Sequence, residues 1–195
     1  MATYTCNALL DSTRKLASWR GAGYSNAEGL YFVRCIPFKG TRSIVYEWRV
    51  KPSPIKRNKD GSMPRISKPS YYTVQLELQN IEFADSIDDG QVKADNTWAV
   101  QEYKGEKYYF KKPAIDINPV RIRCSCLDFV HRGMYEAYKN GILYGGIFRH
   151  YQRKTPAPPE GRPYANPMHV PMMCKHIYAC ITRSITEGWI LGASK

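Results

Sequence analysis

The chain has 195 residues, of which 43% are hydrophobic, and it carries a formal net charge of +12. This composition allows a packed core and excludes a wholly disordered protein, and no apolar run is long enough to cross a membrane as a helix. The first seven residues lack the basic-then-apolar order of a secretory signal, so we expect a soluble, intracellular protein.

The excess of basic residues lies at both ends of the sequence. Residues 1–60 hold 11 basic and 4 acidic side chains, and residues 121–195 hold the same numbers, so each part has a net charge of +7. The intervening residues 61–120 have a net charge of −2. Such a distribution suits a polyanionic partner, either nucleic acid or an acidic protein, although it also serves solubility alone.

The N-terminal part is predicted to form one short helix followed by strands. We expect a helix over residues 7–18, with Asn7 as its N-cap and with apolar anchors at Leu9, Leu10 and Leu16. Residues 30–36 are apolar and aromatic, and residues 43–50 alternate, so both segments are predicted strands. In the second strand the side chains predicted to share one face are Ile44, Tyr46 and Trp48.

A basic, proline-containing connection follows at residues 51–70. It has a single acidic residue, Asp60, against six basic ones: Lys51, Lys56, Arg57, Lys59, Arg65 and Lys68. A connection of this length is either a solvated loop between two strands or an arm that binds a polyanion.

The next segments predict more β-structure. Residues 72–79 alternate as a half-buried strand, and the pattern slips by one residue at Asn80, which predicts a β-bulge there. Residues 98–103 and 106–110 predict a hairpin that turns at Lys104-Gly105. Residues 1–117 are therefore predicted to form a β-rich platform with one short helix.

Two pairs of metal-ligating residues stand out in the remaining sequence, residues 118–195. Cys124 and Cys126 end a strand of period two, so both thiols should face one point. Cys174 and His176 open a helical pattern of apolar residues, where the positive end of the helix dipole favours thiolate over thiol. Three thiolates and one imidazole make a closed tetrahedral site, so the sequence predicts one structural zinc ion.

Other readings of these cysteines remain open. The thiols could be reduced residues packed in the core, because free cysteine is among the most buried residue types. Cys180 and His169 lie near enough in the sequence to replace a ligand, and an iron–sulfur cluster would require Cys180 to point inward.

The order Cys-x-Cys, spacer, Cys-x-His at the start of a helix resembles the SWIM-type zinc finger, and Leu127-Asp128-Phe129 after the second cysteine fits this resemblance. The resemblance implies a strand–strand–helix module that binds DNA or protein. The spacer of 47 residues departs from the family pattern because it is much longer, and it is proline-rich within residues 140–173. Long spacers of this kind are similar to those of uncharacterised tailed-bacteriophage proteins. The predicted fold is therefore α+β, a β-rich platform followed by a zinc-bound SWIM-like module.

No catalytic motif accompanies the cysteines, so we expect a protein that is not an enzyme and has no small-molecule substrate or membrane partner. One hypothesis is a structural or interaction protein that binds protein partners in an assembly, such as a virus particle assembled in the host cytoplasm. The alternative is a nucleic-acid-binding zinc finger. The basic residues predicted to contact nucleic acid or another partner are Arg121, Arg123, Arg132, Arg149, Arg153, Lys154 and Lys175.

Overall fold

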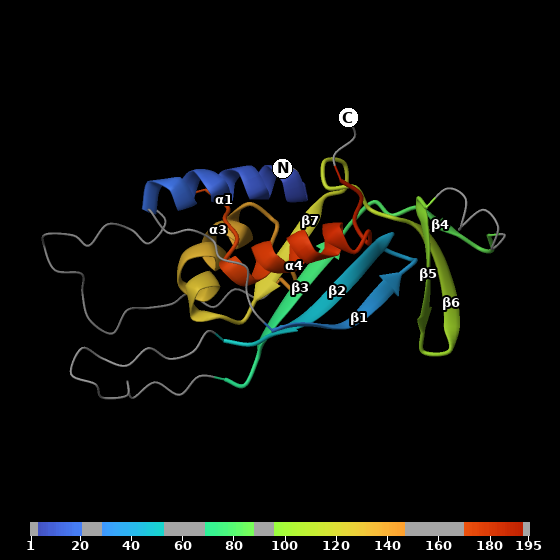
Figure 1. Ribbon diagram of the computed structural model, residues 1–195. Coiled ribbons are helices and arrows are strands. Elements are labelled where there is room, and N and C mark those ends of the chain that lie inside the picture. The colour runs from blue at the N-terminus through green and yellow to red at the C-terminus, as the bar shows by residue number, and fades with distance from the viewer. Residues whose placement is uncertain (1–3, 21–28, 53–68, 88–95, 147–169, 193–195) are drawn as a thin grey trace, which may run out of the picture.

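A computed structural model describes residues 4–20, 29–52, 69–87, 96–146 and 170–192, with the side chains of residues 16–20 excepted. Within these ranges the fold is α+β, as predicted, with two antiparallel sheets and helices packed on the larger one (Figure 1). The helices are α1 (Cys6–Arg20), α3 (Met134–Lys139) and α4 (Lys175–Thr186), and a π-helical turn, η1 (Phe129–Gly133), leads directly into α3.

The larger sheet has the strand order β1-β2-β3-β7. Its strands are β1 (Leu30–Phe38), β2 (Ser43–Val50), β3 (Tyr72–Leu78) and β7 (Val120–Cys124). The predicted strand over residues 43–50 is confirmed, and Ile44, Tyr46 and Trp48 are all buried. Because β7 pairs with β3, residues on both sides of position 117 belong to one sheet.

The smaller sheet has the order β4-β6-β5 and consists of β4 (Phe83–Ala84), β5 (Trp98–Tyr103) and β6 (Glu106–Lys111). The predicted hairpin at Lys104-Gly105 is confirmed. Lys104 has φ 54° and Gly105 has φ 82°, and two positive φ values are the signature of the type I′ turn that matches strand twist.

The predicted bulge at Asn80 is wrong. β3 ends at Leu78, Asn80 adopts φ 58°, and Phe83 then pairs with Phe110 in the smaller sheet. The slip in the alternation therefore marks the point where the chain leaves one sheet for another.

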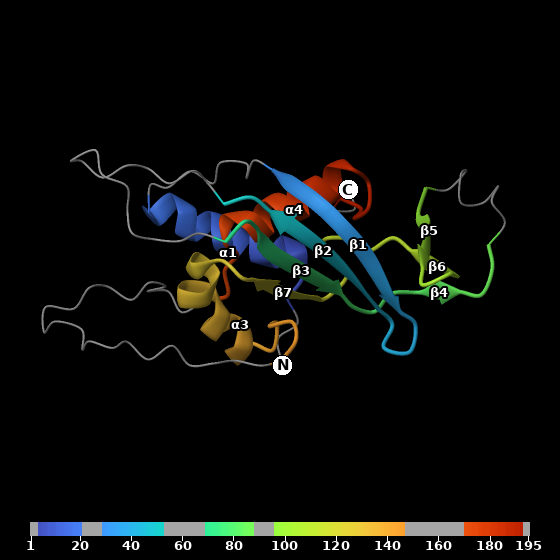
Figure 2. The same ribbon diagram turned by 90° about the horizontal axis from the view of Figure 1, so that it is seen from below.

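Helices α1 and α4 cover one face of the larger sheet, whose other face is seen from below in Figure 2. The N-cap of α1 is Thr5 and not Asn7 as predicted, because the Ala8 N–H donates to Thr5 Oγ1 at 3.3 Å. Leu9 and Leu10 are buried, as their spacing indicates. The side chain of Leu16, the third predicted anchor, lies outside the described residues.

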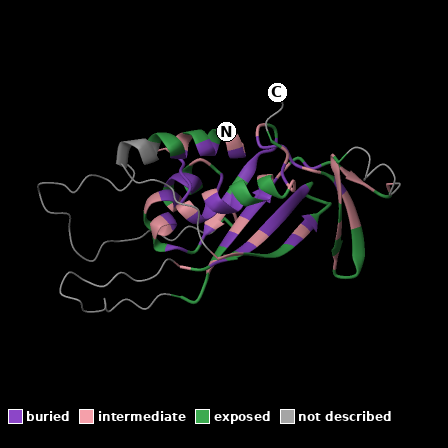
Figure 3. Ribbon diagram, viewed as in Figure 1, coloured by how far each residue is buried: buried purple, intermediate pink, exposed green. Residues whose placement is uncertain are grey.

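The core lies between this sheet face and the two helices (Figure 3). Leu76 and Ile122 face each other across β3 and β7 and are fully buried. Helix α4 ends in a Schellman motif at Gly188, where the Gly188 N–H donates to Ile185 O and the Trp189 N–H donates to Ser184 O. This turn brings the Trp189 ring to within 5.5 Å of the Trp48 ring, measured between centroids.

No helix in the described ranges is both long enough and apolar enough to span a bilayer.

Candidate metal centre

The first half of the centre lies where β7 ends. Cys124 is the last residue of β7, and Cys126 follows as the chain turns toward η1. The Cys124 Sγ accepts a hydrogen bond from the Cys126 N–H at 3.4 Å, and the Cys126 Sγ accepts one from the Phe129 N–H at 3.4 Å. These backbone donors point both sulfurs inward and stabilise negative charge on them.

The second half lies at the start of α4. Cys174 is the N-cap residue in an extended conformation, and His176 lies in the first helical turn. The preceding residue is held by α1, because the Met173 N–H donates to Thr13 Oγ1 at 3.0 Å. Thr13 is fully buried and lies far from Met173 in the sequence, so no local signal could have predicted its role.

The ligand atoms of Cys124, Cys126, Cys174 and His176 all lie within 4.8 Å of one another, and all four residues are buried. The His176 Nδ1 is 3.9 Å from the Sγ atoms of Cys124 and Cys174. Ligands at Zn–S ~2.3 Å and Zn–N ~2.0–2.1 Å in a tetrahedron are separated by about 3.6–3.8 Å. The four side chains therefore form a buried Cys₃His cluster that could hold one metal ion, and the donor set favours zinc.

The pKa shifts of the three clustered thiols favour the binding of a cation. Hydrogen bonds from Cys124 and Cys174 lower the pKa of the Cys126 thiol well below its usual range. The opposite shift affects its neighbours: burial raises the pKa of Cys174, and the hydrogen bond with Cys126 raises that of Cys124. Burial together of three thiols disfavours ionisation of all three, and a divalent ion would supply the charge that lets them ionise.

The imidazole of His176 is oriented for ligation through Nδ1. Its other nitrogen, Nε2, is buried and has no hydrogen-bond partner among the described residues. A neutral imidazole that binds a metal through Nδ1 carries its proton on Nε2. The His176 ring packs against Tyr72, with 4.9 Å between ring centroids. Burial, followed by the charges of Cys126 and Cys124, raises the pKa of the Tyr72 hydroxyl.

The alternative ligands do not join the cluster. Cys180 is buried on α4 one turn after His176, and it lies outside the group of converging ligand atoms. His169 falls outside the described residues. An iron–sulfur site on four cysteines would need Cys180 among those atoms.

Two further thiols, Cys6 and Cys35, lie in the core away from the cluster, and burial raises the pKa of each to about 12. At pH 8 about one in 10⁴ of such groups is a thiolate, so we expect iodoacetamide to leave both unmodified in the folded protein. Raising the pH toward 12 should start their modification, because the thiolate form then becomes populated. Peptide mass spectrometry of native and urea-unfolded samples measures this difference, and rapid labelling at pH 8 in the native sample would contradict it.

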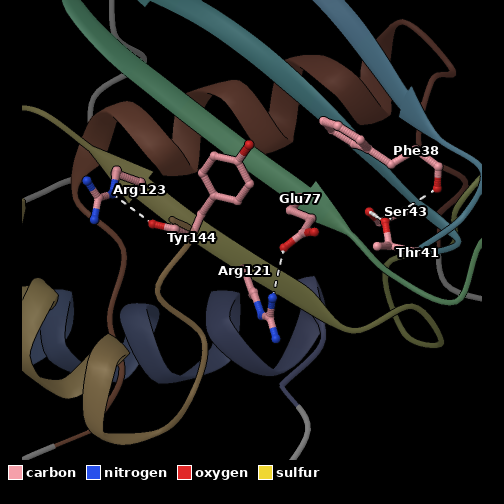
Figure 4. Close-up of polar contacts among 7 residues, drawn as sticks. All are labelled: Phe38, Thr41, Ser43, Glu77, Arg121, Arg123 and Tyr144. Atoms are coloured by element: carbon pink, nitrogen blue, oxygen red, sulfur yellow. Dashed lines mark hydrogen bonds and ion pairs between the residues drawn. The ribbon is translucent and has the colours of Figure 1, made fainter. Parts of the chain in front are cut away.

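Of the predicted partner-binding residues, Arg121 and Arg123 lie on the face of the larger sheet opposite the helices. Arg121 forms an ion pair with Glu77 at 3.4 Å, and the Arg123 Nε donates to the Tyr144 carbonyl at 2.8 Å (Figure 4). Arg132 on η1 pairs with Asp128 at 2.7 Å, and Lys175 opens α4. Three members of the set, namely Arg149, Arg153 and Lys154, lie outside the described residues, as do residues 53–68 of the basic connection.

Asp128, a neighbour of the cysteines, does not act as a helix N-cap, because its side chain makes no capping hydrogen bond and the helical backbone already includes it. Its carboxylate pairs instead with Arg132 in the next turn.

Gly133 is needed for packing next to the cluster. A Cβ atom at this position would lie 2.9 Å from the Phe129 ring and 3.1 Å from the Met172 carbonyl oxygen. We expect Gly133→Ala to lower the free energy of unfolding by about 1–3 kcal/mol, because the crowding outweighs the gain in helix propensity. The matched variant is Gly40→Ala, where the new methyl group meets nothing within 4 Å. Urea denaturation of both variants checks this, and equal stabilities would contradict it.

Comparison with known proteins gives no family assignment: no family model matches the chain, and neither a curated protein nor a solved structure matches it significantly. What is established is a buried Cys₃His cluster beside the C-terminal helix of an α+β fold, suited to one zinc ion.

Proposed function

We propose that this protein is a non-enzymatic interaction protein whose fold is clamped by one structural zinc ion in a SWIM-type site. The observation that carries the proposal is the closed donor set: four buried ligand atoms converge from β7 and α4. Four protein ligands complete a tetrahedral zinc, and a catalytic zinc needs a position left for water or substrate.

The clamp joins parts of the chain that are distant in sequence. The Cys124–Cys126 pair lies at the end of β7, and the Cys174–His176 pair lies at the start of α4, which packs on the same sheet. When bound, zinc supplies a cross-link between these two elements, and the Thr13 hydroxyl positions the Met173 backbone just before the ligands. The role of these residues is to hold a surface rigid for a partner.

We propose that the partner is a protein, as in an assembly such as a virus particle, and not a nucleic acid. The described arginines of the predicted contact set already have acceptors: Glu77 for Arg121, the Tyr144 carbonyl for Arg123, and Asp128 for Arg132. A phosphate would have to displace these partners, which weakens its binding. Exposed aromatic residues, among them Tyr31, Tyr135 and Tyr138, are typical anchors of protein interfaces.

Electrophoretic retardation of short single- and double-stranded DNA at a series of salt concentrations tests this choice. We expect retardation at low salt only, with affinity lost steeply as salt rises, because a chain of charge +12 attracts any polyanion. Binding with a Kd below ~1 µM at physiological salt would overturn the proposed function in favour of nucleic-acid binding.

A further inference from the structure

Strand β1 presents an open edge. It is the first strand of the larger sheet, and no described strand pairs with its other side. The Lys51 N–H donates to Gly29 O at 3.0 Å, so Gly29 and Lys51 form a hydrogen-bonded pair. In an antiparallel ladder such pairs alternate with pairs that exchange no hydrogen bonds. The main-chain N–H and C=O groups of Leu30 and Phe32 therefore point away from β2, and the side chain of Phe32 is 38% exposed.

Two cavities lie beside this edge, on the face of the sheet that α4 covers. The larger, of about 450 Å³, is lined by residues that include Leu30, Phe32, Trp48 and Trp189. The smaller, of about 220 Å³, is lined by Phe32, Cys35, Trp189 and part of β5. Phe32 and Trp189 line both cavities, and their ring centroids are 4.4 Å apart, so this pair separates them.

Trp48, one of the residues that line the larger cavity, is itself buried. It is 2% exposed, and its Nε1 atom has no partner among the described residues.

The features of β1 favour a short peptide over a second copy of the chain. A bulge between Phe32 and Arg34 and the proline at position 37, which lacks an N–H, interrupt the second half of the edge. Two copies would also bring two chains of charge +12 together.

The charges around the edge favour an acidic partner. Lys51 lies over the Tyr31 ring at one end of β1, and Lys112 in the smaller cavity donates to Asn96; neither has a carboxylate partner among the described residues. The acid that lines the larger cavity, Glu187, is already paired with Arg183.

We propose that the first half of β1 binds an extended peptide segment with acidic ends, which adds a strand to the sheet. Peptide residues opposite Leu30 and Phe32 would exchange main-chain hydrogen bonds with them, and their side chains, two positions apart, would enter the cavities. This inference rests on the proposed function, because it names the class of protein partner.

The test is fluorescence anisotropy with the labelled peptide Asp-Glu-Thr-Trp-Thr-Leu-Thr-Glu-Asp and the zinc-bound full chain. We expect a Kd of ~1–50 µM, and a peptide with lysine in place of the acids should bind about tenfold more weakly. N-methylation of the Trp and Leu amides, which face β1, should abolish binding. N-methylation of the intervening Thr amides, which face solvent, should have little effect.

On the protein side, Phe32→Ala should weaken binding about tenfold or more, since Phe32 lines both cavities. Phe38→Ala is its matched control, because Phe38 lies on the same strand, is 42% exposed and lines neither cavity. Thermal melts of both variants check that each remains folded. Equal affinities of the two variants, or equal affinities of the two N-methylated peptides, would overturn the proposal.

Two further outcomes separate this inference from the proposed function. If the zinc-bound protein binds neither the peptide at 200 µM nor DNA at physiological salt, the assignment of the β1 edge fails and the proposed function stands. If the protein sediments as a dimer and the Phe32→Ala substitution makes it monomeric, the edge binds a second copy and the peptide proposal is overturned. Tight DNA binding would overturn both.

Discussion

The double variant Cys174→Ser, His176→Ala should lose its zinc and melt about 10–20 °C below the wild type. Both residues are buried at the start of α4 and converge with Cys124 and Cys126, so their replacement removes half of the ligands. Structural zinc sites contribute several kcal/mol or more to folding, and each kcal/mol changes the Tm of a domain of this size by about 2–4 °C. Differential scanning calorimetry with metal analysis measures both effects.

Cys180→Ala is the matched control for this experiment. Cys180 is also fully buried on α4, one turn after His176, but it is outside the ligand cluster. The control should keep one zinc ion and lose only about 1–2 kcal/mol, the cost of a small cavity. Melting temperatures that fall equally in the two variants would mean that the cysteines act only as core residues.

The variant Phe129→Ala should lower the free energy of unfolding by about 3–5 kcal/mol. Phe129 is fully buried, its ring fills the space next to Gly133, and its N–H donates to the Cys126 Sγ. Loss of the ring should let η1 move and should therefore also weaken the retention of zinc. Urea denaturation and a competition titration with a chromophoric chelator measure the two quantities.

Phe38→Ala serves as its control, because it removes the same ring from a position that is 42% exposed. We expect a change within about 0.5 kcal/mol and unaltered zinc affinity. A Phe129→Ala protein as stable as Phe38→Ala would show that η1 does not support the metal centre.

Much of the fold could be predicted from local patterns. The alternation in residues 43–50 predicted the bounds of β2, and Lys104-Gly105 predicted the position of the hairpin turn. The type of that turn follows only from the positive φ values of both residues. The N-cap of α1 lies two residues before the predicted one because Thr5 and Asn7 are both good caps, and only the Ala8 hydrogen bond distinguishes them.

The centre itself was predictable as a set of ligands, since spacing and residue type are enough to mark Cys124, Cys126, Cys174 and His176. Its supports were not. The Thr13–Met173 hydrogen bond and the Gly133–Phe129 contact depend on how the chain packs, and no periodic pattern in the sequence indicates either of them. The exit from the larger sheet at Asn80 was not predictable for a similar reason, because a slip in alternation does not say which sheet the next strand joins.

The most direct test of the zinc assignment is X-ray absorption at the zinc edge, with metal content, on protein purified without added metal. We expect one zinc ion per chain, with three sulfur ligands at about 2.3 Å and one nitrogen ligand at about 2.0–2.1 Å. A chain that contains no zinc, or whose zinc is bound mainly by oxygen, would contradict it.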